Sequence, residues 1–214
     1  MKRMLTVIAA AMFTVAPLAA QSLGMPNWSS PKGGTGVTIS GDLAMPNSDL
    51  GKGTAFGARA TLGLANMSLT AGLASWKPKG LTQSFTSIGG KASFRVIGGS
   101  LIPLSIALEA TGNHVSGANG DSARTRIGLG GAVSVNVPTP GLSIEPYLAV
   151  QNRWYKLSGV SGTTSNIGWT LGANVGFGMF GLHLAYDSEN FGGGTNGHII
   201  GIGAHVALKA PIGM

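Results

Sequence analysis

The sequence predicts an all-β protein, an antiparallel up-and-down β-barrel of about ten strands that crosses a membrane. Glycine makes up 36 of the 214 residues and proline ten. Almost no window can therefore hold a stable helix, because each interior glycine costs about 1 kcal/mol relative to alanine. With 43% hydrophobic and only 10% charged residues, the chain is too apolar to be disordered. Apolar and polar residues alternate along most of its length, which is the pattern of strands.

The first element, residues 1–20, has the pattern of a secretory signal peptide. Lys2 and Arg3 form a basic start, an apolar run follows over 5–15, and small residues end the segment at Ala20. We expect cleavage after Ala20, with an uncleaved anchor helix as the alternative. No other apolar run approaches the ~20 residues of a membrane-spanning helix, so a polytopic helical membrane protein is excluded. The chain has no cysteine, so it must be stabilised without disulfides.

A lead-in rich in Gly, Pro and Ser follows over 21–34, and we expect it to lie in the periplasm. Ten stretches of alternating polarity then make up the barrel over 35–208, before a tail at 209–214. They span 35–45, 53–64, 66–76, 83–97, 101–113, 123–137, 141–156, 164–178, 180–189 and 197–208. Most reach the 9–11 residues that a tilted strand needs to cross a bilayer. If 35–45 or 180–189 is not a full strand, the barrel has eight strands.

The connections between these stretches alternate in length. The longer ones, of seven or eight residues, are 45–52, 77–83, 114–120, 157–163 and 190–196. The turns between them are short, at 65, 98–100, 137–140 and 178–179. An up-and-down barrel with short turns at one end and longer loops at the other has this order.

One face of each strand is apolar and the other is polar or small. On 141–156, for example, Leu148 and Val150 oppose Glu145 and Gln151. Because the polar face carries Gly, Ala, Ser, Thr and Asn with isolated charges, rather than dense Lys and Glu, we expect the apolar face to point outward into lipid. The outward aromatic residues gather near the two ends, as in the girdles of membrane barrels. They are Phe56, Trp154, Trp169 and Tyr186 at the long-loop end, and Phe94 and Phe177 at the short-turn end.

Charged and histidine side chains with inward parity are predicted to form a lumen network. Its members are Lys91, Arg95, Glu109, Arg124, Arg126, Glu145, Arg153, His183, Asp187 and His205. If consecutive strands pair antiparallel about the turns that connect them, Glu109 lies near Lys91 and Arg126, and Arg126 lies beside Arg153. Buried charges persist when they are paired, which favours a salt-bridge network that braces a narrow lumen. A basic constriction that favours small anions is the functional alternative.

The sequence offers little for catalysis or cofactors. His183 and His205 have inward parity and are expected to lie roughly 7–8 Å apart on neighbouring strands. His183 and Asp187 are four residues apart on one strand, a span of ~13 Å, so they cannot form a hydrogen-bonded dyad by themselves. We therefore predict no catalytic site, no metal site and no cofactor. The cations are scattered without interleaved aromatic residues, so nucleic acid is not an expected partner.

The last hairpin, from Phe180 to Asp187 and on through three glycines to Leu208, resembles the small bacterial outer membrane β-barrel proteins. This class includes the outer membrane protein A-like and opacity-type barrels, and the likeness covers about 35–208. It implies an outer membrane location, contacts with membrane lipid and lipopolysaccharide, assembly by the outer membrane machinery and a monomeric state. One departure is that Leu208 ends the last strand, where such barrels usually have an aromatic residue.

The resemblance implies a structural role or a narrow passive channel for small solutes, with anions as the favoured class. A surface adhesion barrel is an alternative, although loops of seven or eight residues are short for it. A lipid-modifying enzyme is less favoured, because no convergent triad is visible.

Overall fold

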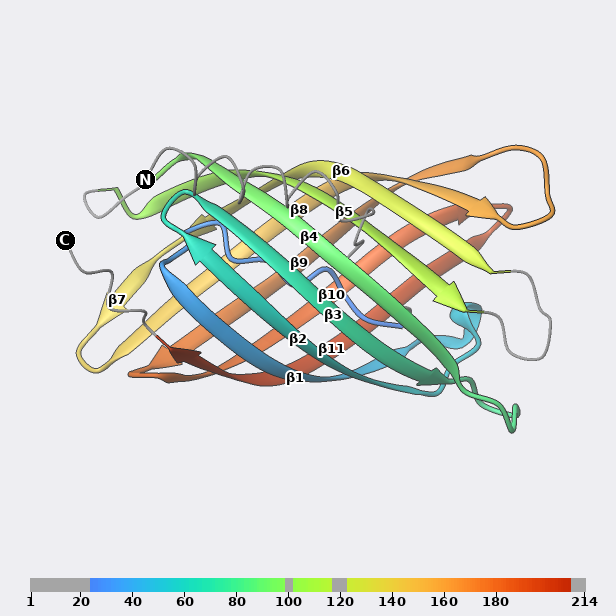
Figure 1. Cartoon of the computed structure of the whole chain (residues 1–214), viewed down its shortest axis with the longest axis horizontal. Coiled ribbons are helices and arrows are strands. Elements are labelled where there is room, and N and C mark those ends of the chain that lie inside the picture. The colour runs from blue at the N-terminus through green and yellow to red at the C-terminus, as the bar shows by residue number, and fades with distance from the viewer. Residues whose placement is uncertain (1–23, 99–101, 117–122, 209–214) are drawn as a thin grey trace, which may run out of the picture.

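The computed structural model describes residues 24–98, 102–116 and 123–208, which form a closed antiparallel β-barrel (Figure 1). Its strands are β1 (Gly36–Pro46), β2 (Thr54–Leu64), β3 (Met67–Lys77), β4 (Phe85–Ile97), β5 (Leu104–Ser116), β6 (Arg124–Val135), β7 (Val137–Thr139), β8 (Leu142–Leu157), β9 (Thr164–Phe177), β10 (Phe180–Gly192) and β11 (Thr195–Leu208). A 3-10 helix, η1 (Ser48–Leu50), lies in the first long loop. No helix within the described part of the chain is long and apolar enough to cross a membrane.

The barrel has ten strands, as predicted, because β7 continues β6. Ser134 of β6 pairs with Tyr147 of β8, and Val137 of β7 pairs with Ile144 in the same register. Neighbouring strands pair antiparallel all the way round, and β1 pairs with β11 to close the ring. The eight-strand alternative is therefore excluded.

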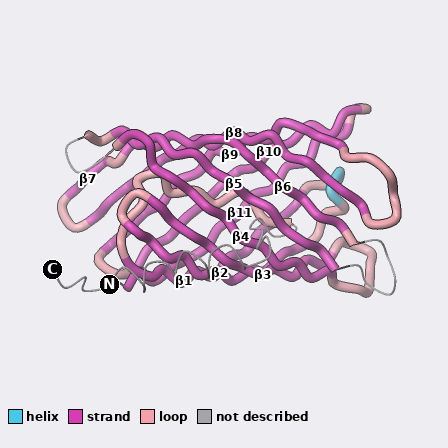
Figure 2. Tube along the Cα trace, turned by 45° about the horizontal axis from the view of Figure 1, so that its top comes forward, coloured by secondary structure: helices cyan, strands magenta, loops and turns pink. Residues whose placement is uncertain are grey.

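The strands are tilted and their connections gather at the two ends of the barrel (Figure 2). The last loop is shorter than predicted. It is only Gly193 and Gly194, because β10 continues beyond the expected 189 and β11 begins before the expected 197. The sharp turn uses three consecutive glycines, Gly192, Gly193 and Gly194, with φ of 78, 60 and 84°. Such positive values are accessible to glycine and rare for other residues.

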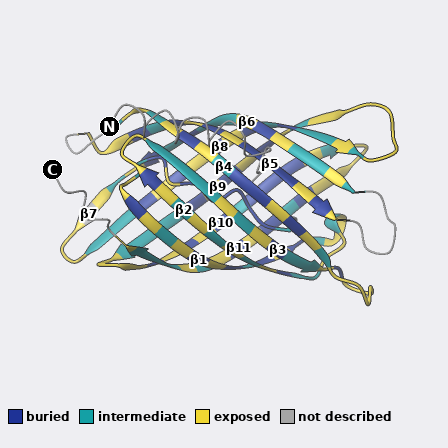
Figure 3. Cartoon of the chain, viewed as in Figure 1, coloured by how far each residue is buried: buried dark blue, intermediate teal, exposed yellow. Residues whose placement is uncertain are grey.

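The two faces of the wall follow the predicted alternation, which appears as bands of exposed and buried residues along each strand (Figure 3). Large apolar side chains point outward: Ile167 is 67% exposed and Phe56 63%. Phe94, Trp169 and Phe177 are also exposed, and Trp154 and Tyr186 are partly so. The inward face carries small, polar and charged side chains, so the interior of this barrel is polar and its exterior is apolar.

The lumen is not empty, because the chain itself runs through it. Where the sequence predicts a periplasmic lead-in over 21–34, the structure instead places residues 25–32 inside the barrel, and we call them the plug segment (Figure 1). Met25 packs with Ala55 and Trp76 near the long loops, and Lys32 contacts Arg95 near the short turns. The plug segment therefore runs the length of the interior before β1 begins. Its backbone polar groups can be buried there because the wall supplies partners.

Candidate functional site: the occupied lumen

Glu109, on β5, holds the middle of the plug segment. Its carboxylate accepts hydrogen bonds from Asn27 Nδ2 at 3.2 Å and from the Ser29 hydroxyl. It also forms an ion pair with Lys91 Nζ at 2.9 Å and accepts a bond from Gln151 Nε2 at 3.3 Å. Glu109 is 3% exposed. Because a buried carboxylate is stable only when its oxygens are paired, these contacts tie the plug segment to the wall.

Glu145, on β8, holds the far end of the plug segment in the same way. It accepts hydrogen bonds from Ser30 Oγ at 2.7 Å and from the backbone N–H of Lys32 at 2.9 Å. From the wall, Ser134 Oγ donates at 2.9 Å and Asn174 Nδ2 at 3.1 Å. One acidic side chain thus joins three barrel strands, β6, β8 and β9, to the plug segment.

Backbone groups of the plug segment are bound as well. The carbonyl of Trp28 accepts from Lys91 Nζ, and that of Ser29 from Asn174 Nδ2 at 2.8 Å. The Asn27 carbonyl accepts from the Tyr147 hydroxyl at 3.3 Å, and the Asn27 N–H donates to Asp187 Oδ2 at 3.2 Å. An extended segment with no strand partner therefore satisfies its backbone through side chains of the wall.

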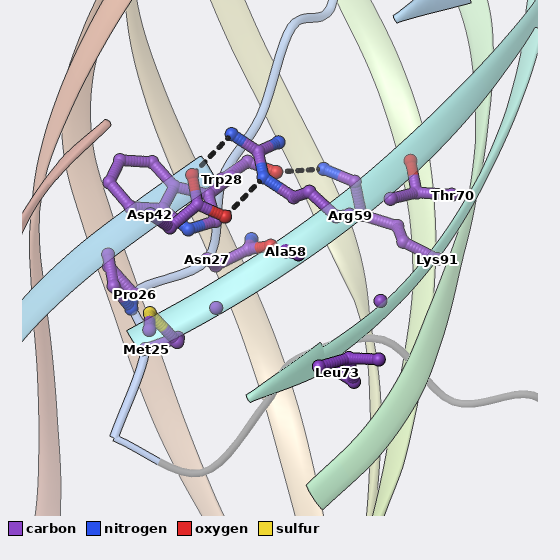
Figure 4. A pocket seen from close by; sticks show the side chains of 12 residues that line it. Met25, Pro26, Asn27, Trp28, Asp42, Ala58, Arg59, Thr70, Leu73 and Lys91 are labelled. Atoms are coloured by element: carbon purple, nitrogen blue, oxygen red, sulfur yellow. Dashed lines mark hydrogen bonds and ion pairs between the residues drawn. The ribbon is translucent and has the colours of Figure 1, made fainter. Parts of the chain in front are cut away.

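Trp28 is the largest side chain of the plug segment, and it inserts into a charged cluster on β1, β2 and β10. The guanidinium of Arg59 lies 5.1 Å from its ring centre, and the His183 ring meets it edge-on at 4.5 Å. Arg59 pairs with Asp42 at 2.8 Å, and His183 Nε2 lies 2.6 Å from Asp42 Oδ1. Figure 4 shows Arg59 and Asp42 facing each other beside Trp28, with Lys91 reaching the plug backbone.

Arg153, on β8, is the centre of a second buried cluster. Its guanidinium binds Asp187 at 2.7 Å and Glu189 at 2.9 Å, both on β10, and it is 1% exposed. The Tyr155 hydroxyl donates to Glu189 at 2.6 Å. The guanidinium crosses over β9 at Gly168, where a Cβ atom would overlap it. A methyl group at this position would therefore have to displace the guanidinium that links two strands that are not neighbours.

The structure brings some predicted network residues together and separates others. Lys91 and Glu109 form an ion pair. Arg126 lies opposite Asn113 on β5 and Tyr155 on β8, four residues along β5 from Glu109 and two residues along β8 from Arg153. The prediction that Arg126 lies near Glu109 was wrong, because the register of β5 and β6 separates the two residues by four positions along the strands. His183 and His205 are adjacent, with their Nδ1 atoms 3.2 Å apart. The described residues contain no group of three or more His, Asp or Glu that is arranged to hold a metal ion.

Several residues of the site were not found from the sequence. Arg59 and Glu189 have inward parity, and this pattern could have placed them in the lumen. Trp28 and Ser29 lie in a stretch without alternating polarity, so no pattern placed them there. Asp42 has inward parity as well, on the first strand. Nothing in a local pattern indicates that a segment outside the strands will fill the lumen.

Two spaces adjoin the plug segment. A crevice of about 40 Å³ lies between it and β1–β4, beside Trp28, Arg59 and Lys91. A larger cavity of about 310 Å³, which we call the vestibule, lies beyond Met25 toward the long loops. The plug segment thus forms the floor of the vestibule.

No protein-family model matches the sequence, and no curated protein is significantly similar to it. Among solved structures, the β domain of the Bordetella autotransporter BrkA is similar over 82% of this chain and 100% of its own, with a TM-score of 0.52 and 11% identity. Neisserial surface protein A matches over 81% and 98%, with a TM-score of 0.39 and 13% identity. The N-terminal β-barrel domain of Pseudomonas aeruginosa OprF matches over 82% and 99%, with a TM-score of 0.40 and 11% identity.

These structures are a β domain, a surface protein and a β-barrel domain of bacteria. The likeness to the first of them concerns the fold, since the identity is low, and it agrees with the closed ten-stranded barrel described above.

Proposed function

We propose that this chain is a bacterial outer membrane β-barrel with a structural role, whose lumen is closed by its own plug segment. The apolar outer face fits a lipid environment, and the fold is that of outer membrane barrels. In this proposal the signal peptide at 1–20 directs export and the barrel spans the outer membrane as a monomer, with lipid and lipopolysaccharide around it.

The observation that carries the proposal is the set of bonds between the plug segment and the wall. Glu109, Glu145 and Asp187 each accept from the plug segment, while Lys91 and Asn174 donate to it. An open anion pore needs cations that are available to solutes. Here Lys91, Arg59 and Arg153 are each paired with a carboxylate, which argues against anion selectivity.

The two other functions inferred from the sequence have less support. The long-loop end is built from short connections, such as 47–53, 78–84 and 158–163, which offer little projecting surface for adhesion. For catalysis, the close pair of His183 and Asp42 lies under Trp28 beside a crevice of about 40 Å³, which has no room for a lipid substrate.

The experiment is conductance in planar bilayers, with the wild type compared to the double variant Glu109→Gln/Glu145→Gln. Loss of both charges weakens the bonds to the plug segment, because hydrogen bonds to charged groups are about twice as strong as neutral ones. We expect no steady current from the wild type and discrete channel events from the double variant.

Two further variants complete this test. Asp49→Asn removes a carboxylate that does not contact the plug segment, and it should stay silent. Deletion of residues 25–32 should conduct continuously if the barrel forms, which heat-dependent migration on gels would verify. A steady wild-type current equal to that of the deletion would refute the closed lumen.

A further inference from the structure

Three lysines gather at the long-loop end of β2 and β3. Lys52 belongs to the loop between β1 and β2, Lys77 ends β3, and Lys79 follows in the next loop. All three are exposed. Their backbones are held together, because the N–H of Lys79 donates to the Gly51 carbonyl at 3.1 Å and the Trp76 indole donates to the Lys52 carbonyl at 3.2 Å. We call these three lysines the lysine rim.

The positive charges of the lysine rim are not balanced by carboxylates. Among the described residues none of its members forms an ion pair, whereas the lumen cations Arg59, Lys91 and Arg153 do. Asp49, the acidic residue in the loop of Lys52, accepts a hydrogen bond from the backbone N–H of Asn196 at 3.0 Å. Its carboxylate is thus bound on the β11 side of β1, away from β3. The lysine rim is therefore open to an anion from outside the barrel.

The lysine rim lies directly beyond the apolar outer wall. Leu73 of β3 points outward and is 57% exposed, while its neighbour Ala74 is buried. Lys77 shares the outward parity of Leu73 and pairs with Thr54 of β2, which is two residues, or about 7 Å along the strand, from the outward Phe56. A lysine at this level reaches lipid headgroups with its ammonium while its apolar stem lies along the wall.

We propose that the lysine rim binds the phosphate of a membrane lipid in the leaflet at the long-loop end. The ammonium groups of the rim donate to the phosphate oxygens, and the acyl chains lie over Phe56 and Leu73. Exposed lysines beside a bilayer attract anionic lipids, and contact of the chains with the wall favours a lipid over free phosphate. This contact rests on the membrane placement proposed above and adds a specific lipid to it.

The test is native mass spectrometry of the folded full-length barrel, released from neutral detergent micelles, with phosphatidic acid as the probe. Phosphatidylcholine with the same acyl chains is the matched lipid, since a quaternary ammonium caps its phosphate. We expect phosphatidic acid to bind at least tenfold more tightly than phosphatidylcholine. The triple variant Lys52→Gln/Lys77→Gln/Lys79→Gln should weaken phosphatidic acid binding about a hundredfold, or about fivefold for each lysine, as expected of basic residues at an anionic membrane surface.

Two variants and one competitor serve as controls. Lys52→Arg/Lys77→Arg/Lys79→Arg keeps the charges and should bind phosphatidic acid like the wild type. Lys156→Gln removes an exposed lysine at the same end of the barrel, with β4, β5 and β6 between its strand and β3, and should also bind like the wild type. Inorganic phosphate should displace the lipid no more than sodium chloride of equal ionic strength does. Because the substituted lysines are exposed, we expect all variants to fold, which heat-dependent migration on gels verifies.

The proposal is overturned if the triple glutamine variant binds phosphatidic acid like the wild type, or if the two lipids bind equally. It is equally overturned if inorganic phosphate displaces the lipid more than the chloride does, since the site would then be one for free phosphate. Failure of the membrane placement is a separate result, because a barrel that does not insert into phosphatidylcholine vesicles would refute it directly. A barrel that inserts but does not prefer phosphatidic acid refutes the lysine rim alone.

Discussion

At the scale of single residues, the interior of this barrel depends on charged side chains that have partners on other strands. Arg153 is the clearest case, since its guanidinium binds Asp187 and Glu189 across β9. Removal of one member would leave a buried charge unpaired, which costs more than the pair itself contributes. The small residues of the wall are as important as the charged ones, because they leave the space in which the long side chains lie.

This dependence predicts a difference between two glycines of β9. In Gly168→Ala the new methyl group overlaps the Arg153 guanidinium, whereas at Gly176 nothing lies within 4 Å of the position that a methyl group would take. We expect Gly168→Ala to lower the free energy of unfolding by about 1–3 kcal/mol, as overpacking does. Gly176→Ala should change it by no more than about 0.5 kcal/mol. Urea unfolding in detergent micelles measures both, and equal stability of the two variants would contradict the role of Gly168.

At the scale of elements, the plug segment is neither strand nor helix, and its position depends on its bonds to Glu109 and Glu145. Each carboxylate binds two groups of the plug segment as well as side chains of the wall. The segment therefore behaves as part of the core of the barrel, even though no strand pairs with it.

The absence of cysteine allows a direct test of this attachment. Met25 is 3% exposed, so a thiol introduced by Met25→Cys should react slowly with maleimide. In the Glu109→Gln/Glu145→Gln background the plug segment is held less firmly, and we expect labelling at least tenfold faster. Ser158→Cys, on an exposed loop, should react rapidly in both backgrounds. If Met25→Cys labels at the same rate with and without the two glutamates, these side chains do not hold the plug segment.

At the scale of the whole molecule, the barrel is apolar outside and polar inside, the reverse of a water-soluble protein. Leu171, near the middle of β9, points outward and is 54% exposed, while Phe177 ends the same strand at 43%. In a bilayer the first would lie near the midplane and the second near an interface.

The position of these two residues predicts a depth-dependent cost of a charge. Leu171→Arg should lower the free energy of unfolding in lipid vesicles by about 2–4 kcal/mol, and Phe177→Arg by about 0–1 kcal/mol. Guanidinium titrations of vesicle-inserted protein measure both values. Equal costs at the two positions would contradict a lipid-facing outer wall.

Much of this architecture follows from sequence patterns, because strand alternation and turn composition are local properties. The spans expected for 53–64 and 66–76 agree with β2 and β3 to within one residue, and the ten-strand order is correct. The inward parity of Lys91, Glu109 and Arg153 is also local. The partners of these side chains cannot be predicted from a local pattern, because the pairing depends on the diameter of the barrel and on which strands face each other across the lumen.

The sequence by itself determined the class of the fold, the face that points outward and the identity of most inward charges, since each depends on the period of two residues along a strand. Only the tertiary structure decided that residues 25–32 fill the lumen and that Arg153 binds Asp187 and Glu189. The physical reason is that a segment without alternating polarity gives no indication, from its sequence alone, of where it lies in the fold. It is held inside by carboxylates, amides and cations that converge only when the ring of strands is closed.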